Sequence, residues 1–270
     1  VLVGDNLKKN KAKQVMDSGQ LALGAYVALS DPQIVEIIGI SGFDAVFIDM
    51  EHTAFDLSLV QQMIVAADLV DITPIVRVSD SDPGFILRVL DMGAQGIVIP
   101  HVDGLEGAKK AVEAVRYPPV GLRGGAGATR AARFGSVGWA DHVRTSNQEI
   151  LLSVMTEDTK AISQVSEIAA LDGVDLVALG PTDLSQTLGV TDPSDPKLRS
   201  EVERIATEVK KAGNTKLQMP MNHPAFPLTA LELVELGVGY TNVAPQPPAI
   251  LMREMQNAVR DTHKALGRKD

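Results

Sequence analysis

The sequence predicts an α/β fold, a (β/α)8 TIM barrel in which residues 1–270 form a single domain. Eight apolar runs of strand length alternate with eight amphipathic segments of helical period, the order typical of parallel strands joined by helices. With 45% hydrophobic residues, the chain is long enough to bury one continuous core. A doubly wound open sheet is the alternative, but no Gly-x-Gly-x-x-Gly motif follows the first run, and eight repeats favour a closed sheet.

The expected strands are short runs rich in β-branched residues, and the expected helices carry apolar residues at a period near 3.6. We expect strands near residues 21–29, 44–50, 73–78, 96–101, 149–155, 174–180, 215–220 and 239–244. We expect helices at 32–40, 57–69, 84–92, 105–115, 159–170, 197–212, 225–236 and 249–266. Several helices have a start signal, because Asp31-Pro32, Asp82-Pro83 and Asp158 offer capping acids. Gly19, Gly42, Gly93 and Gly213 are expected to end helices.

The long segment from Tyr117 to Gln148 interrupts this alternation. It contains the glycine-rich run of residues 121–127 and the basic residues Arg130 and Arg133. A phosphate-binding glycine loop is one interpretation, but the run does not follow a strand directly and lacks the Lys-Ser/Thr of a P-loop. We favour a structural or substrate-shaping loop.

Composition excludes several classes of protein. With no cysteine, the chain has no disulfide, no thiolate metal site and no cysteine nucleophile. A net charge of −9 without a basic stripe argues against nucleic acid as a partner. No apolar stretch approaches the ~20 residues that span a bilayer. We therefore expect a soluble, cytoplasmic protein without a membrane partner.

Two carboxylates, Glu157 and Asp183, each follow an apolar run in the second half of the chain. If these runs are adjacent parallel strands, both acids lie at the carboxyl rim of the barrel, where active sites of this fold are found. Two anionic oxygen ligands would suit a hard divalent cation with positions open for substrate. The alternative, equally supported by spacing, is that Glu157 is a first-turn helix acid and Asp183 a cap or turn residue.

Other polar residues end strands at the same predicted rim. His52 would serve as a general base, or else is a hydrogen-bonded core histidine. Arg77 would stabilise an oxyanion or enolate, or else pairs with Asp49 or Glu51. His101 and His223 face the same rim and are interpreted as supporting or incidental.

Lysine is missing from the interior positions that imine chemistry needs. The sixth strand has none, Lys216 opens the seventh strand at the opposite end, and Lys160 lies on a helix. Electrophilic activation must then come from a metal or from Arg77, which disfavours an imine-forming aldolase.

Five segments together resemble the HpcH/HpaI aldolase family of metal-dependent pyruvate aldolases, which includes 2,4-dihydroxyhept-2-ene-1,7-dioate aldolase. They cover most of residues 20–190, in the family's order. The segments are Gly42-Phe43-Asp44 through Asp49-Met50-Glu51-His52, Pro74-Ile75-Val76-Arg77-Val78, residues 90–100 (Leu-Asp-Met-Gly-Ala-Gln-Gly-Ile-Val-Ile-Pro), residues 116–124 (Arg-Tyr-Pro-Pro-Val-Gly-Leu-Arg-Gly) and residues 179–185 (Leu-Gly-Pro-Thr-Asp-Leu-Ser).

The resemblance implies a site and a reaction. Glu157 and Asp183 would bind Mg²⁺, Mn²⁺ or Co²⁺, and Arg77 would stabilise a pyruvate enolate. His52, oriented by Asp91, would act as acid and base. The segment Gly180-Pro181-Thr182-Asp183 would bind the pyruvate carboxylate through the backbone amides of Thr182 and Asp183. The partners implied are pyruvate or oxaloacetate and an aldehyde, and the reaction is cleavage or formation of 4-hydroxy-2-oxoacids.

The family's barrels form a trimer of dimers through an exchanged C-terminal helix, so the resemblance also implies a homo-oligomer, by analogy a hexamer. The apolar residues of segment 249–266 stand at helical spacing compatible with packing on a partner. Two positions depart from the family pattern: Met155 stands where glutamine is usual, and Met50 where glycine is common.

Two alternatives stay open. The same site would also suit oxaloacetate decarboxylation or a further carbon–carbon bond formation from the enolate, as in macrophomate synthase of this family. A non-catalytic small-molecule-binding barrel is the alternative from another class, because the two methionine departures alter the site.

Overall fold

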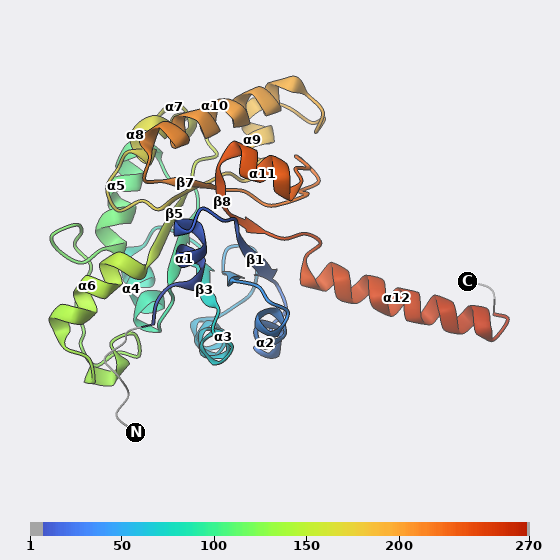
Figure 1. Ribbon diagram of the computed structural model, residues 1–270, viewed down its shortest axis with the longest axis horizontal. Coiled ribbons are helices and arrows are strands. Elements are labelled where there is room, and N and C mark those ends of the chain that lie inside the picture. The colour runs from blue at the N-terminus through green and yellow to red at the C-terminus, as the bar shows by residue number, and fades with distance from the viewer. Residues whose placement is uncertain (1–7, 269–270) are drawn as a thin grey trace.

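The chain forms a closed barrel of eight parallel strands in sequence order, β1 to β8, as the computed structural model of residues 8–268 shows (Figure 1). The strands are β1 Ala22–Val27, β2 Ala45–Asp49, β3 Thr73–Arg77, β4 Gly96–Ile99, β5 Leu151–Met155, β6 Leu176–Ala178, β7 Lys216–Gln218 and β8 Val238–Asn242. Seven of the eight strands lie within the predicted runs, and β8 begins one residue before its predicted run. The predicted (β/α)8 barrel is therefore confirmed.

Helices cover the outside of the barrel. They are α1 Lys11–Asp17, α2 Gln33–Ile40, α3 Leu57–Leu69, α4 Pro83–Asp91, α5 Gly104–Val115, α6 Trp139–Glu149, α7 Thr159–Ser163, α8 Val165–Ala169, α9 Pro181–Leu188, α10 Pro196–Ala212, α11 Ala230–Leu236 and α12 Pro247–Ala265, with a short 3₁₀ turn at Arg133–Gly135. The capping predictions hold at Asp82 and Asp158, whose side chains accept from the backbone N–H groups of Phe85 and Ala161. All four expected glycines have a positive φ at helix ends.

The helices differ from the prediction in three respects. The segment expected as one helix over 159–170 is divided at Gln164, which leaves the helical region with φ −110° and ψ 17°. The helix expected to start at 225 starts at Ala230, because Thr229 and Glu232 form a capping box there. None of the eight expected helices corresponds to α1, α6 or α9, which are short or carry few apolar residues, although Gly19 was expected to end a helix and follows α1.

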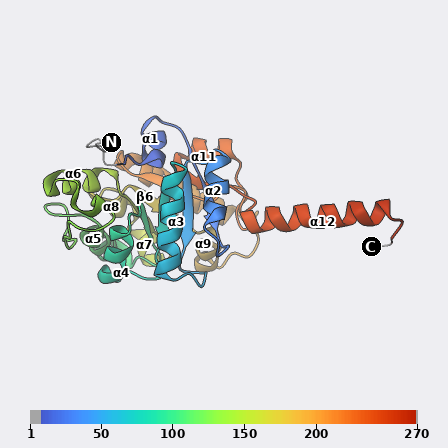
Figure 2. The same cartoon turned by 90° about the horizontal axis from the view of Figure 1, so that it is seen from below.

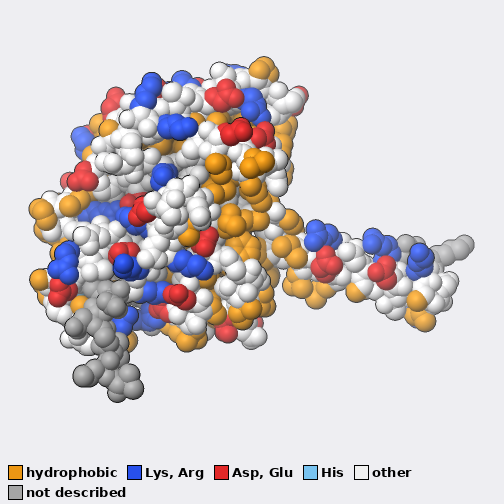
Figure 3. Space-filling view, viewed as in Figure 1, with side chains coloured by type: hydrophobic (Ala, Val, Ile, Leu, Met, Phe, Trp, Pro, Cys, Tyr) orange, Lys and Arg blue, Asp and Glu red, His pale blue; other side chains and the backbone are white. Residues whose placement is uncertain are grey.

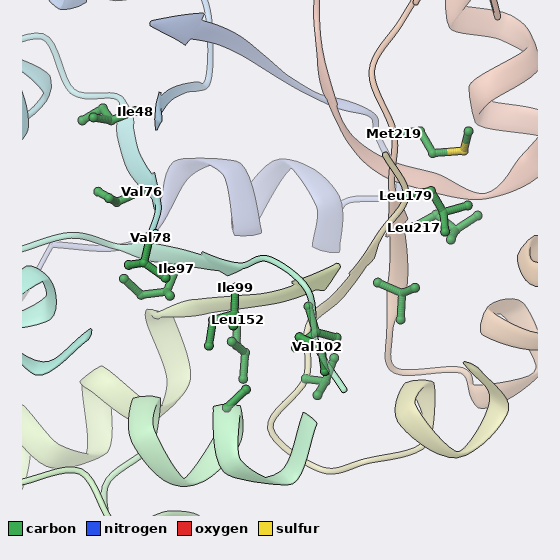
Figure 4. Packing of buried hydrophobic residues seen from close by; sticks show 14 of the residues in the cluster. Ile48, Val76, Val78, Ile97, Ile99, Val102, Leu152, Leu179, Leu217 and Met219 are labelled. Atoms are coloured by element: carbon green, nitrogen blue, oxygen red, sulfur yellow. The ribbon is translucent and has the colours of Figure 1, made fainter. Parts of the chain in front are cut away.

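Alternation along the strands divides the core into two layers. Residues such as Ile48, Val76, Ile97 and Leu152 point outward and pack beneath the helices (Figure 4). Their neighbours Phe47, Ile75, Val98 and Leu151 fill the inside of the barrel. This alternation also decides which residues at the strand ends face the axis. Asp49, Arg77 and Met155 follow the inward series on β2, β3 and β5.

The amino end of the barrel is closed by the residues around α1. The side-chain amide of Asn10 donates to the carbonyls of Gln95 and Glu149, at 2.8 and 2.9 Å, just before β4 and β5 begin. Inside the barrel Gly24 allows Tyr240 to lie against the backbone of β1, because a Cβ there would be 1.9 Å from the Tyr240 hydroxyl oxygen. The opposite, carboxyl end is left for the polar residues described below.

Helix α12 extends away from the barrel in both views (Figures 1 and 2). Its large apolar side chains are exposed, and within residues 8–268 none of its residues is buried. Over the same described range, no helix combines the length and apolar character needed to cross a lipid bilayer.

Candidate active site

Polar side chains at the ends of β2 and β3, and in the segments after β5 and β6, meet at the carboxyl end of the barrel. Asp49 and Arg77 are the last residues of β2 and β3, and their Cα atoms are direct partners in the strand register. Glu157 follows β5 by two residues, and Asp183 lies in the first turn of α9, five residues after β6 ends. Because β5 pairs with β6, the two carboxylates predicted to share a rim do so.

Asp49 and Arg77 form a buried two-point ion pair. Arg77 Nε lies 2.7 Å from Asp49 Oδ1 and Nη2 lies 2.8 Å from Oδ2. The Tyr26 hydroxyl donates to the same carboxylate from β1. Burial opposes ionisation of Asp49, but the hydrogen bonds from Arg77 and Tyr26 outweigh it and lower the pKa of this carboxyl. The ion pair between Arg77 and Asp49, which the sequence analysis gave as the alternative role of Arg77, is therefore present. Asp49 bonds Nε and Nη2 of the guanidinium, and Nη1 is left for other partners.

Arg77 Nη1 faces the centre of the rim. It lies 2.8 Å from Glu51 Oε2 and 4.0 Å from the Met155 sulfur. The Met155 methyl group in turn approaches Gly180, since a Cβ on that glycine would be 3.5 Å from Met155 Cε. Met155 thus lies between Arg77 and the carboxylates of Glu157, which follows β5, and Asp183, which lies in α9.

Glu157 and Asp183 converge on Gly180. A Cβ placed on Gly180 would lie 2.8 Å from Glu157 Oε2 and 3.1 Å from Asp183 Oδ2, so both oxygens border the same small space. Glu157 is 4% exposed, and its Oε2 has no hydrogen-bond partner among the described residues. A buried carboxylate oxygen without a donor is costly, and a neighbouring second carboxylate increases that cost.

The electrostatics agree with this geometry. Burial, followed by the charge of Asp183, raises the pKa of Glu157 to about 7, against the lowering effect of His101. Near neutral pH Glu157 is therefore poised between its protonated and its ionised form.

His101 joins the site, although the sequence analysis considered it supporting or incidental. Its Nε2 lies 3.0 Å from Glu51 Oε1 and its Nδ1 lies 3.2 Å from Glu157 Oε1. The imidazole thus links two carboxylates from different strands. The backbone makes this possible, because His101 follows β4 with φ +49°, in the left-handed region that turns the chain sharply.

His52 and Asp91 lie apart within the described chain. The His52 side chain is 66% exposed at the rim, with Nε2 3.9 Å from Glu51 Oε2. Asp91 is the last residue of α4, at the opposite end of the barrel, and its carboxylate pairs with Arg123 at 2.8 Å. The expectation that Asp91 orients His52 is therefore not met within one chain, since a helix after β3 carries its last residue back to the amino end.

The segment Gly180–Asp183 forms the start of α9. The first backbone N–H bonded within this helix is that of Leu184, which donates to the Gly180 carbonyl. The N–H groups of Thr182 and Asp183 therefore precede the helical hydrogen bonds and remain available to an anion. His223, after β7, is near enough to feel the charge of Asp183, but burial lowers the pKa of its imidazole.

Of the side chains at the rim, the carboxylates of Glu157 and Asp183 are the pair best suited to hold a divalent cation. Among residues 8–268, no three or more His, Cys, Asp or Glu side chains are grouped so that they could hold a metal. A cation held by Glu157 and Asp183 would take its other ligands from substrate or water. The unpartnered Oε2 of Glu157 and the space beside Gly180 are what such an ion would use. The donors are carboxylate oxygens, which suit Mg²⁺ or Mn²⁺.

Comparison with known proteins agrees with this site. A pyruvate aldolase of Rhizobium etli is 35% identical over 88% of this chain and 91% of its own length. A 5-keto-4-deoxy-D-glucarate aldolase of Shigella boydii is 36% identical over 76% of this chain and 79% of its own. The crystal structure of an HpcH/HpaI aldolase from Desulfitobacterium hafniense superposes with a TM-score of 0.83, at 28% identity, over 93% of this chain and 96% of that one.

The family model described as HpcH/HpaI aldolase/citrate lyase matches residues 22–238, which include β1 to β7, the first residue of β8 and all the rim residues described above. The predictions of an enzyme and of this resemblance are confirmed. The chain belongs to the HpcH/HpaI aldolase/citrate lyase family and is an aldolase of the lyase class.

Proposed function

We propose that this aldolase is metal-dependent and cleaves or forms 4-hydroxy-2-oxoacids, with pyruvate and an aldehyde as the two halves of its substrate. The observation that carries the proposal is the convergence of Glu157 and Asp183 on Gly180, beside the fixed guanidinium of Arg77. The names of the relatives support it, since one is a pyruvate aldolase and another acts on a keto-deoxy sugar acid.

Glu157 and Asp183 would hold the cation, which we propose to be Mg²⁺, Mn²⁺ or Co²⁺. Bound there, it would act as a Lewis acid toward the oxygens of the 2-oxoacid and so acidify the adjacent methyl group. His101 would keep Glu157 in place through its Oε1, which leaves Oε2 free for the ion.

The remaining residues would bind substrate and handle charge. The N–H groups of Thr182 and Asp183 would receive the carboxylate of the oxoacid, within the segment Gly180-Pro181-Thr182-Asp183. Arg77 Nη1 would stabilise the enolate oxygen, because Asp49 already fixes the rest of the guanidinium. His52, exposed at the rim, would exchange the proton with the aldehyde oxygen. A cytoplasmic location is part of the same proposal.

The function is tested by pyruvate release from a panel of 4-hydroxy-2-oxoacids, followed with a coupled dehydrogenase. We expect release with Mg²⁺, Mn²⁺ or Co²⁺ and none in EDTA. Arg77→Met should lower kcat by roughly 10²- to 10³-fold, because it removes a donor aimed at developing negative charge. Glu106→Gln, on the exposed surface of α5, is the matched control and should leave kcat unchanged. Metal-loaded protein that releases no pyruvate from any member, and does not decarboxylate oxaloacetate, would contradict the proposal.

Gly180→Ala should separate metal binding from folding. The glycine has φ −85°, which alanine adopts without strain, but the new Cβ would occupy the space between Glu157 and Asp183. We expect Mn²⁺ affinity, measured by calorimetry, to fall by roughly 10- to 100-fold while the melting temperature of the metal-free protein changes little. Gly138→Ala is the control, because the Cβ added there would lie 3.6 Å from its nearest neighbouring atom. Unchanged Mn²⁺ affinity in Gly180→Ala would place the ion elsewhere.

The raised pKa of Glu157 predicts how the stability of the metal-free protein changes with pH. In the folded metal-free protein this carboxyl binds a proton up to about pH 7, whereas its ordinary value is 4.5. The folded state therefore holds more protons than the unfolded state between these values, and its stability falls as pH rises through this window. Urea denaturation in EDTA should show this fall in the native protein and a flatter profile in Glu157→Gln. Identical slopes in the two proteins would refute the assignment.

We also propose a homo-oligomer, by family resemblance a hexamer, in which α12 packs on a second copy. One face of α12 exposes Leu251, Met252, Met255 and Val259, and this apolar face projects from the barrel (Figure 3). Sedimentation should show an oligomer for the native chain and a smaller species for the double substitution Leu251→Glu, Met255→Glu. Asn257→Glu, on the opposite face of the helix, should leave the mass unchanged. A native chain that sediments as a monomer would exclude this assembly.

A further inference from the structure

A cavity of about 410 Å³ lies at the end of the barrel opposite the candidate active site. Its wall includes Gln95, just before β4, and Ile150, just before β5, so it opens near the amino ends of these strands. The long segment between α5 and β5, which the proposed function does not use, supplies much of the remaining wall through residues 123–134 and α6. Lys and Arg side chains are visible over α4 and α6 on this side of the molecule (Figure 3).

The wall carries an excess of positive charge. It includes four cationic side chains and two carboxylates, which are Lys8, Arg123, Arg130, Arg133, Asp68 and Glu149. One carboxylate is shared, since Asp68 pairs with both Lys8 and Arg130. The Arg133 guanidinium has no hydrogen-bond or ion-pair partner within residues 8–268. Arg123 pairs with Asp91 beyond the wall, so Arg133 is the cation of the wall whose charge no described carboxylate neutralises and that an anion in the cavity would meet.

Buried donors in the same wall lack acceptors. The Arg123 side chain is 1% exposed and is held by Asp91 at 2.8 Å and by the Tyr117 ring, 4.5 Å from the guanidinium carbon to the ring centroid. Its Nε and Nη1 nevertheless have no hydrogen-bond partner, and neither does Nδ1 of buried His142, whose Nε2 faces the Tyr117 hydroxyl. Three buried nitrogens without a partner in one wall are unusual, because nearly all buried polar atoms in folded proteins have a hydrogen-bond partner.

The backbone that presents Arg133 is strained. Arg133 and Phe134 are consecutive residues other than glycine with φ +49° and +55°. Such conformations persist where the surrounding structure holds them, and they are concentrated at ligand-binding sites. The turn places Arg133 at the cavity together with Arg130 and Ala131.

We propose that this cavity binds a small molecule that carries a doubly charged oxyanion group, either a phosphate or a pair of carboxylates. Arg133 supplies an uncompensated cation, and Arg123 supplies two donors that need oxygen acceptors. His142 Nδ1 supplies a third donor in the tautomer that carries the proton on this nitrogen. The site is distinct from the aldolase centre, because its wall lies at the amino ends of the strands and the rim carboxylates lie at their carboxyl ends.

The proposal is tested by calorimetry with inorganic phosphate and, separately, with malonate. The titrations use the full chain in EDTA, in the native form and in Arg77→Met, so that binding at the aldolase centre would appear as a difference between the two forms. We expect one saturable site per chain in both forms, and the tighter of the two probes identifies the phosphate or the dicarboxylate as the group recognised. Because the measurement needs neither metal nor catalysis, its outcome is independent of the proposed function.

Two substitutions and one control locate the site. Arg133→Gln should weaken binding of the preferred probe by about tenfold through the loss of a charge-assisted hydrogen bond, without affecting folding, because this guanidinium has no partner to lose. Arg123→Lys keeps the charge and the pairing with Asp91 but removes the unpaired donors, and should also weaken binding. Arg144→Gln, on the exposed surface of α6 and outside the cavity wall, should bind as the native chain does. Absence of saturable binding for both probes, or native affinity in Arg133→Gln, would overturn the proposal.

Discussion

The buried ion pair between Asp49 and Arg77 is the interaction on which the arrangement of the candidate site depends. Removing two charges from water is costly, and a buried pair recovers that cost only with good geometry and further hydrogen bonds. Both conditions hold, because the strand register sets Asp49 opposite Arg77 and Tyr26 donates a third hydrogen bond. The guanidinium is thus fixed before any substrate arrives, with Nη1 directed at the rim. A donor held in advance at the place where charge develops stabilises a transition state without reorganisation.

Beyond this pair, the rim has more negative than positive charge. Glu51, Glu157 and Asp183 are balanced only by Arg77 Nη1 and by whatever charge His101 carries. In the metal-free protein Glu157 keeps a proton up to about neutral pH, as its raised pKa indicates, and the proposed cation would replace that proton. The proposed cation and the proposed chemistry of the site therefore depend on the same carboxylates. For the same reason Glu157, a candidate metal ligand, is also a buried group whose pKa is raised.

The sequence predicted those parts of the fold and site that depend on local periodicity. Strand ends were found because side chains alternate along a strand, and Arg77, Glu157 and Asp183 followed from them. His101 was undervalued because its contacts depend on a left-handed turn after β4, and a histidine before Val102 carries no signal for that conformation. The placement of Asp91 rested on resemblance rather than on periodicity, and in the chain it pairs with Arg123 from the long segment, 32 residues away. Contacts of this kind depend on how a loop packs, which hydrophobic patterning does not encode.

Met155 shows how a departure from the family pattern changes the site. Its sulfur lies against Arg77 Nη1 and its methyl group against Gly180, so it fills the space between the arginine and the carboxylate pair. A glutamine there would offer that space an amide and compete with Glu51 for Nη1, whereas a thioether accepts hydrogen bonds only weakly. The methionine therefore leaves Nη1 to Glu51 and to an incoming oxygen, and it makes the wall less polar, which strengthens charge interactions nearby. By this reasoning the substitution alters the environment of Arg77 more than the convergence of Glu157 and Asp183, which Gly180 controls.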